Sequence, residues 1–140
     1  MIFAIDFDGT CVSHEFPNIG KDIGAIPVLK ELVEKGHKLI LWTMRADREV
    51  QGETDDEFII NATGTFLTDA INWFKNNDIP LWGIQKNPNQ TNWTTSPKAY
   101  ADMYIDDAAL GCPLYYETDS SKPYVDWYKV RQLLINKDIL

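Results

Sequence analysis

Four short apolar runs, separated by longer polar or amphipathic stretches, predict the strands of a sheet. They occupy residues 1–5, 38–43, 81–84 and 101–106. Each run is a few residues long and rich in Ile, Leu or aromatic residues, which is typical of a buried strand. The first run leads into two carboxylates and a glycine, so we expect the chain to turn directly after it.

Apolar residues recur at helical spacing in three further segments, residues 27–36, 65–77 and 123–134. The first of these begins with a proline and ends with a glycine, which commonly start and stop a helix. A strand, a helix and a strand in succession predict a right-handed parallel crossover. The alternation therefore predicts an α/β fold with a doubly wound, mostly parallel sheet.

The remaining segments are predicted to be loops. Residues 11–26 contain a proline and two glycines and are interpreted as a loop or short flap over the end of the first strand. Residues 45–64 are irregular and largely acidic, and residues 85–97 form a polar loop with two prolines. With 140 residues in total, we expect one domain that spans residues 1–140.

The charge balance narrows the range of partners. The chain carries 21 acidic and 13 basic residues, a formal net charge of -8. Extended nucleic acid and anionic membranes are therefore poor partners, since binding a polyphosphate requires a stripe of basic residues. Cys11 and Cys112 lie far apart and show no metal-binding spacing. Because no leader or membrane-spanning apolar run is evident, we expect a cytoplasmic protein.

Functional side chains follow three of the predicted strands. Asp6 and Asp8 follow the first, Thr43 ends the second, and Asp106 and Asp107 come at the end of the fourth. In an open α/β sheet, ligands bind outside the carboxyl ends of the strands. The sequence therefore predicts one cluster of acids and a hydroxyl, which Lys98 enters from the loop before the last strand.

The Asp6-Phe7-Asp8 segment itself indicates a cation. Two carboxylates that converge at a strand end repel each other unless a cation or a proton lies between them. Oxygen ligands suit a hard divalent metal, and Mg²⁺ is the first candidate. The alternative is an acidic turn at a strand exit without a ligand.

Together these residues resemble the haloacid dehalogenase-like (HAD) phosphatase superfamily. Its first motif is an apolar strand followed by DxDxT, matched by Asp6-Phe7-Asp8-Gly9-Thr10, and its fourth is an apolar strand with paired acids, matched by Asp106-Asp107. Thr43 matches the second motif and Lys98 the third, while Lys86 is the alternative lysine. The motifs span residues 2–107, and the resemblance implies a Rossmann-like core.

The resemblance implies a role for each matched residue. Asp6 is expected to be the nucleophile that forms an aspartyl phosphate, and Asp8 the general acid and base. Mg²⁺ would be bound by Asp6, by Asp106 and by the backbone carbonyl of Asp8, whose side chain must stay free, with Asp107 a direct ligand or close by. Thr43 and Lys98 would bind the phosphoryl group.

Several other residues are assigned more ordinary roles. Arg45 and Arg48 follow Thr43 and could receive a second anionic group of a substrate, but we expect solvated arginines that pair with the acidic loop. His14 and His37 are expected on the surface. Trp93 is the one tryptophan expected to lie in a loop near the site, where it could stack on a ligand.

The intervals between the motifs leave room only for short flap and loop insertions, so the chain resembles a capless or minimally capped member. The resemblance implies a Mg²⁺-dependent phosphomonoester hydrolase that acts on a small phosphate ester or a phosphoprotein. Alternatives are a phosphotransferase and a catalytically silent phosphate-binding module. A receiver module is disfavoured because acids come both first and last along this chain. The physiological substrate and the oligomeric state do not follow from the sequence.

Overall fold

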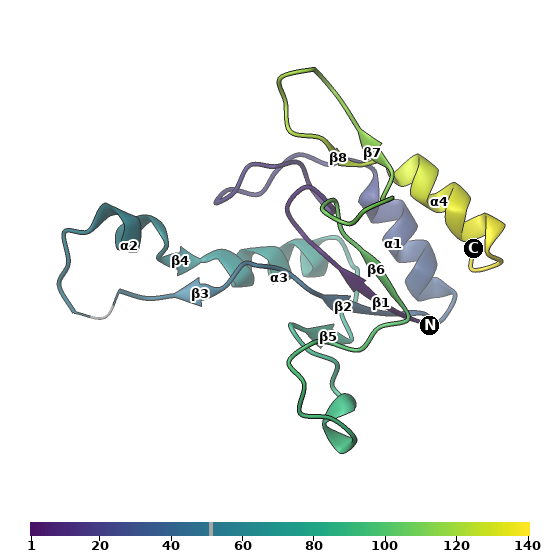
Figure 1. Ribbon diagram of the computed structural model, residues 1–140, viewed down its shortest axis with the longest axis horizontal. Helices are drawn as coiled ribbons and strands as arrows, with labels where there is room; N and C mark the ends of the chain where they lie inside the picture. The colour runs from purple at the N-terminus through teal and green to yellow at the C-terminus, as the bar shows by residue number, and fades with distance from the viewer. Residues whose placement is uncertain (51) are drawn as a thin grey trace.

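A four-stranded parallel sheet forms the centre of the protein. The structure is a computed structural model, which describes residues 1–50 and 52–140. The strands are β1 (Ile2–Ile5), β2 (Lys38–Leu41), β5 (Gly83–Ile84) and β6 (Met103–Ile105). Their order in space is β5-β2-β1-β6, and every neighbouring pair is parallel (Figure 1). The predicted α/β fold with a mostly parallel sheet is confirmed at this level.

Three helices supply most of the helical packing surface: α1 (Ala25–Glu34), α3 (Phe66–Asn76) and α4 (Trp127–Asn136). Helix α1 begins two residues before the predicted Pro27, directly after Gly24. Proline fits there because the first turn of a helix leaves its backbone N–H groups without partners inside the helix. Helix α4 begins at Trp127 rather than at residue 123, and the Asp126 carboxylate caps it by accepting from the Lys129 N–H (3.1 Å).

The hydrophobic core lies between these helices and one face of the sheet. Alternate strand residues such as Phe3, Ile5 and Leu41 are fully buried there, together with side chains of all three helices. Ala4 and Ile40 are also buried, but they belong to the opposite face, where residues of the 85–99 loop approach. A doubly wound arrangement, which requires helices on both faces, is therefore not confirmed by this packing.

Two small antiparallel sheets were not predicted. Strands β3 (Asp47–Arg48) and β4 (Gly64–Thr65) pair with each other and enclose α2 (Glu57–Asn61), so the predicted irregular 45–64 segment is a projecting arm (Figure 1). Strands β7 (Leu114–Tyr115) and β8 (Tyr124–Val125) form a second hairpin. The 85–97 loop also contains a short 3-10 helix, Gln90–Asn92.

None of the helices in the described part of the chain has the length and apolar character needed to cross a membrane.

Candidate functional site

The predicted strand-end residues line one open pocket of about 560 Å³. The Asp6 N–H donates to the Ile105 carbonyl (3.0 Å), which joins the ends of β1 and β6 and brings Asp6 beside the acids that follow Ile105. The pocket is lined by Asp6, Asp8, His14, Phe16, Thr43, Met44, Arg45, Asp106, Asp107, Ala108 and Lys122. Five of the six predicted site residues therefore line one pocket, and Lys98 is the exception.

One side of the pocket is an acidic cluster. Carboxylate oxygens of Asp6, Asp106 and Asp107 all lie within 4.8 Å of one another, and all three side chains are half-buried. The buried Thr10 hydroxyl donates to Asp6 Oδ2 (2.8 Å) and accepts from the Asp107 N–H (3.0 Å). Thr10 thus connects the end of β1 to the end of β6 and fixes the orientation of both acids.

Gly9 permits the tight turn that brings Thr10 back toward Asp6. Its φ is +78°, a conformation that residues with a Cβ rarely adopt. A Cβ on Gly9 would also collide with the His14 ring and the Asp107 carboxylate. The glycine of the first motif is therefore required by both the backbone conformation and the packing.

Crowding of the three acids changes the proton affinity of Asp6. Burial, and after it the nearby charge of Asp106, raise the pKa of Asp6 to about 8, although the hydrogen bond from the Thr10 hydroxyl opposes the rise. A carboxyl group that is buried beside a second acid is more stable with a proton or a cation bound to it. Three oxygen donors within reach of one another fit a hard divalent cation such as Mg²⁺.

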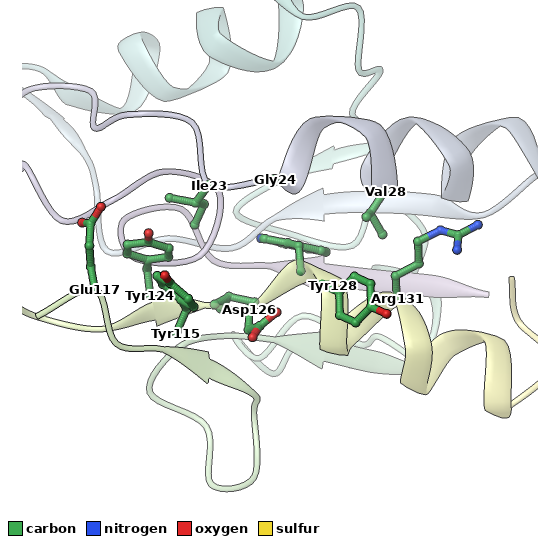
Figure 2. A pocket seen from close by; sticks show the side chains of 11 residues that line it. Ile23, Gly24, Val28, Tyr115, Glu117, Tyr124, Asp126, Tyr128 and Arg131 are labelled. Atoms are coloured by element: carbon green, nitrogen blue, oxygen red, sulfur yellow. The ribbon is translucent and has the colours of Figure 1, made fainter.

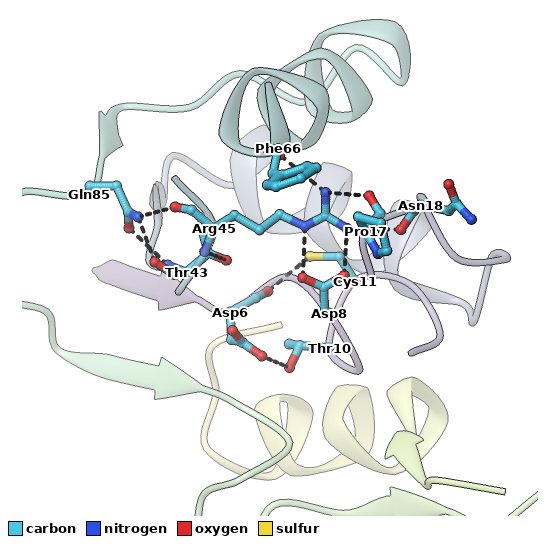
Figure 3. Close-up of polar contacts among 10 residues, drawn as sticks. All are labelled: Asp6, Asp8, Thr10, Cys11, Pro17, Asn18, Thr43, Arg45, Phe66 and Gln85. Atoms are coloured by element: carbon cyan, nitrogen blue, oxygen red, sulfur yellow. Dashed lines mark hydrogen bonds and ion pairs between the residues drawn. The ribbon is translucent and has the colours of Figure 1, made fainter. Parts of the chain in front are cut away.

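The other side of the pocket is neutralised by the protein itself. Arg45 is only 2% exposed and donates from Nε to Asp8 Oδ2 and from Nη2 to Asp8 Oδ1, both at 2.8 Å (Figure 3). The expectation that Arg45 is a solvated arginine paired with the acidic loop is therefore wrong. The Asp8 side chain, which was expected to stay free of the metal for acid and base catalysis, is held by this bidentate pair and still lines the pocket.

Gln85 holds the end of β2, where Thr43 faces the pocket. The Thr43 N–H donates to Gln85 Oε1 (2.9 Å), and Gln85 Nε2 donates to the carbonyls of Thr43 (2.5 Å) and Arg45 (3.1 Å). The Thr43 hydroxyl accepts from the Arg45 N–H (3.1 Å). Gln85 was not predicted as a site residue, although it directly follows β5 and the strand-end rule that found Thr43 applies to it.

The two histidines are less exposed than expected. His14 Nε2 lies 2.9 Å from Asp107 Oδ2, and its side chain is 18% exposed at the edge of the pocket. His37 is half-buried, with Nδ1 at 2.9 Å from the amino group of Met1. Only His14 therefore belongs to the candidate site, and the interpretation of it as a surface residue is wrong.

The predicted lysine does not line the pocket. Lys98 is exposed, and its Nζ lies 5.5 Å from the centre of the Tyr104 ring, whereas the alternative Lys86 is also exposed. Within the described residues, the lysine that lines the pocket is Lys122, from the β7–β8 hairpin. Trp93 is 67% exposed and packs edge-to-face on Tyr100, outside the pocket lining.

A second pocket of about 660 Å³ lies between α1, the β7–β8 hairpin and α4 (Figure 2). Its charged groups already have partners within the protein. Arg131 binds Glu31 through two hydrogen bonds of 2.9 Å, Glu117 pairs with Lys21, and Asp126 caps α4. The strand-end pocket, whose acidic cluster makes no ion pair with a Lys or Arg among the described side chains, is therefore the candidate site.

Both cysteines are free thiols. Cys11 is fully buried below the site, where its Sγ lies 3.3 Å from the Asp6 carbonyl, and Cys112 is half-buried. Burial and the nearby Asp6 carboxylate raise the pKa of the Cys11 thiol well above its usual value. Cys11 is therefore an unreactive packing residue.

Comparison with solved structures finds a conserved protein coded by a locus from Bacteroides thetaiotaomicron. It is 30% identical to this chain, with a TM-score of 0.69, and the match covers 98% of this chain and 91% of that protein. No family model matches the chain, and neither does any curated protein. Because the similarity extends over nearly all of both chains, it includes every element that carries the site.

Proposed function

The chain belongs to the same family as the conserved Bacteroides thetaiotaomicron protein, and we propose that it is a Mg²⁺-dependent phosphomonoester hydrolase of the HAD-like superfamily. The observation that carries the proposal is the meeting of Asp6, Asp106 and Asp107 around Thr10, opposite Asp8. These residues come from the two most specific of the sequence motifs. A site with a nucleophilic carboxylate, a second acid and a cation-binding cluster suits phosphoryl transfer, in which positioning and charge neutralisation supply most of the catalysis.

Asp6 acts as the nucleophile in this proposal. The step starts with Asp6 ionised and Asp8 protonated: an oxygen of Asp6 attacks phosphorus while the bond from phosphorus to the ester oxygen breaks, and Asp8 gives its proton to the departing oxygen. In the second step Asp8 takes a proton from a water molecule, which attacks the aspartyl phosphate. Inorganic phosphate leaves and the carboxylate of Asp6 is restored, so protons and charges balance over the cycle.

The acidic cluster provides the metal site. Asp6 and Asp106 would hold Mg²⁺ with the backbone carbonyl of Asp8, and Asp107 would be a ligand or would orient one. When bound, Mg²⁺ would neutralise charge on the phosphoryl group and on Asp6. Thr43 would donate to a phosphoryl oxygen. Lys122, which lines the pocket, would neutralise the phosphoryl group, whereas Lys98, matched by motif order, and its alternative Lys86 lie outside the pocket lining.

Among the described residues, the segment between Thr43 and Lys98 contains the projecting arm of β3, α2 and β4, whose elements are each two to five residues long. An arm of such short elements supports a capless or minimally capped enzyme. The proposed substrate is a small phosphate ester or a phosphoprotein. A phosphotransferase that uses the same aspartyl phosphate, and a phosphate-binding module without turnover, are the alternatives.

Phosphate release from p-nitrophenyl phosphate and a panel of metabolite phosphates tests the proposal, with Mg²⁺ or with a chelator. We expect release to depend on the metal and to fall at least about a thousandfold in Asp6→Asn, since this change removes the nucleophile. Asp138→Asn is the matched control, because Asp138 is exposed, lies outside the pocket, and has a φ of 58° that asparagine tolerates. An inactive wild type that binds Mg²⁺ would contradict hydrolysis, and full activity in Asp6→Asn would contradict the assigned nucleophile.

A further inference from the structure

Arg45 uses its entire hydrogen-bonding capacity inside the protein. Besides the two bonds to Asp8, Nη1 donates to the carbonyls of Pro17 (3.3 Å) and Phe66 (3.2 Å), and Nη2 donates to the carbonyl of Asn18 (2.9 Å). A guanidinium has five N–H groups, and the five bonds account for all of them. No donor remains for a second anionic group of a substrate.

These bonds join three segments that are far apart in the sequence. Asp8 follows β1, Pro17 and Asn18 belong to the loop at residues 11–24, and Phe66 is the first residue of α3 (Figure 3). The guanidinium carbon lies 5.0 Å from the centre of the Phe7 ring and 5.1 Å from that of Phe16. The arginine is therefore held between two aromatic rings as well as by its hydrogen bonds.

We propose that Arg45 is a positioning residue, which orients the Asp8 carboxylate toward the reacting oxygens and fixes residues 16–18 beside the pocket. This inference rests on the proposed phosphatase activity and extends it to a residue outside the matched motifs. Bidentate binding fixes the plane of a carboxylate, which a single hydrogen bond does not. The Asp8 side chain is 19% exposed, so it still reaches the pocket while Arg45, at 1%, does not contact solvent.

The proposed role of Arg45 can be tested by kinetics, because substrates differ in how much their hydrolysis depends on proton donation by Asp8. An alkyl phosphate needs a proton on its departing oxygen, whereas p-nitrophenolate leaves as a stabilised anion. Misorientation of Asp8 therefore slows attack on an alkyl phosphate much more than attack on p-nitrophenyl phosphate. A purely structural role for Arg45 would lower the amount of active protein and would affect both substrates by the same factor.

Arg45→Lys tests the inference, since lysine keeps the charge but does not bind both carboxylate oxygens in one plane. We expect kcat/KM for the alkyl phosphate to fall about tenfold to a hundredfold more than kcat/KM for p-nitrophenyl phosphate. The matched control is Arg48→Lys, because Arg48 is exposed in β3 only three residues away, and its ratio should equal that of the wild type. Equal losses on both substrates, or no loss, in Arg45→Lys would overturn the inference.

Phe16→Leu is a second variant that tests the same inference if Arg45→Lys does not fold. Phe16 is 54% exposed, so its replacement removes the ring over the guanidinium without opening the core. We expect the same bias against the alkyl phosphate with a smaller magnitude, and an unbiased loss or none would overturn the role of Arg45. A wild type that hydrolyses neither ester overturns the phosphatase proposal together with this inference, whereas an active wild type with unbiased variants overturns the inference alone.

Discussion

The two sides of the pocket treat negative charge in opposite ways. On one side, Asp6, Asp106 and Asp107 gather without an ion pair to any Lys or Arg among the described residues, and His14 Nε2 lies 2.9 Å from Asp107 Oδ2. On the other side, Asp8 is held by a buried arginine whose five donors are all used. A protein that buries a guanidinium beside Asp8 has a means of neutralising acids, so the half-buried cluster without such a partner is where we propose that an external cation binds.

The two sides also differ in whether the neutralising group is exchangeable or is a fixed part of the fold. An external cation can accommodate a phosphoryl group that arrives and leaves, because its remaining ligands are exchangeable. A guanidinium bonded to Asp8, the loop at residues 16–18 and the start of α3 is part of the fold. The comparison therefore predicts that the arginine side governs stability, whereas the acidic side is destabilising until a cation binds.

The largest effect on stability is expected from Arg45→Met. This change leaves the Asp8 carboxylate and three backbone carbonyls without their partner, and breaking a buried ion pair costs about 3–5 kcal/mol. We expect the free energy of unfolding, measured by urea titration at pH 7, to fall by that amount. Arg131→Met is the control, because the Arg131–Glu31 pair is also bidentate, with two bonds of 2.9 Å, but lies on the surface. Similar losses in both variants would contradict the special role of burial at Arg45.

A smaller effect of opposite sign is expected from Asp6→Asn without divalent cations. The folded-state pKa of Asp6 is about 8, above the ordinary value of 3.8, so between these pH values the folded protein holds a proton that the unfolded chain has lost. Raising the pH through this window therefore removes stability from the wild type. Asparagine does not titrate and still accepts the Thr10 hydrogen bond, so Asp6→Asn should be more stable than wild type by roughly 2–4 kcal/mol at pH 8.

The same urea titrations at pH 5 and pH 8, with and without Mg²⁺, check this prediction. The advantage of Asp6→Asn should shrink at pH 5, where the wild type keeps its proton, and should shrink at pH 8 when Mg²⁺ stabilises the wild type. Asp138→Asn should show neither trend. An advantage that is independent of pH would contradict the assignment of the raised pKa to Asp6.

The contrast between the two sides also explains what the sequence predicted. Asp6, Asp8, Thr43 and Asp106 each follow or end an apolar run, and the rule that parallel strands end at one edge was sufficient to bring them together. The four strands and three main helices follow from hydrophobic periodicity, with shifts of a few residues at their ends. The small sheets β3–β4 and β7–β8 have two-residue strands, which are too short to show any periodicity.

Pairings between distant loop residues could not be predicted from the hydrophobic pattern of the sequence. Arg45 and His14 lie in irregular segments, and nothing local distinguishes a buried arginine from a solvated one until Pro17, Asn18 and Phe66 are placed around it. The exposed position of Lys98 over Tyr104 likewise depends on the path of the 85–99 loop. Local pattern therefore predicted the acids of the site, whereas tertiary packing determined how each acid is neutralised.

Detection of a phosphorylated Asp6 tests the central claim most directly. Asp8→Asn, mixed with p-nitrophenyl phosphate and Mg²⁺ and quenched in acid, lacks the base that activates water in the second step. Mass spectrometry of its peptides should therefore find one phosphoryl group on Asp6, more than in wild type, and none in the Asp6→Asn, Asp8→Asn double variant. An active wild type with no phosphoryl group on Asp6 in any variant, or with the group on another residue, would contradict the account.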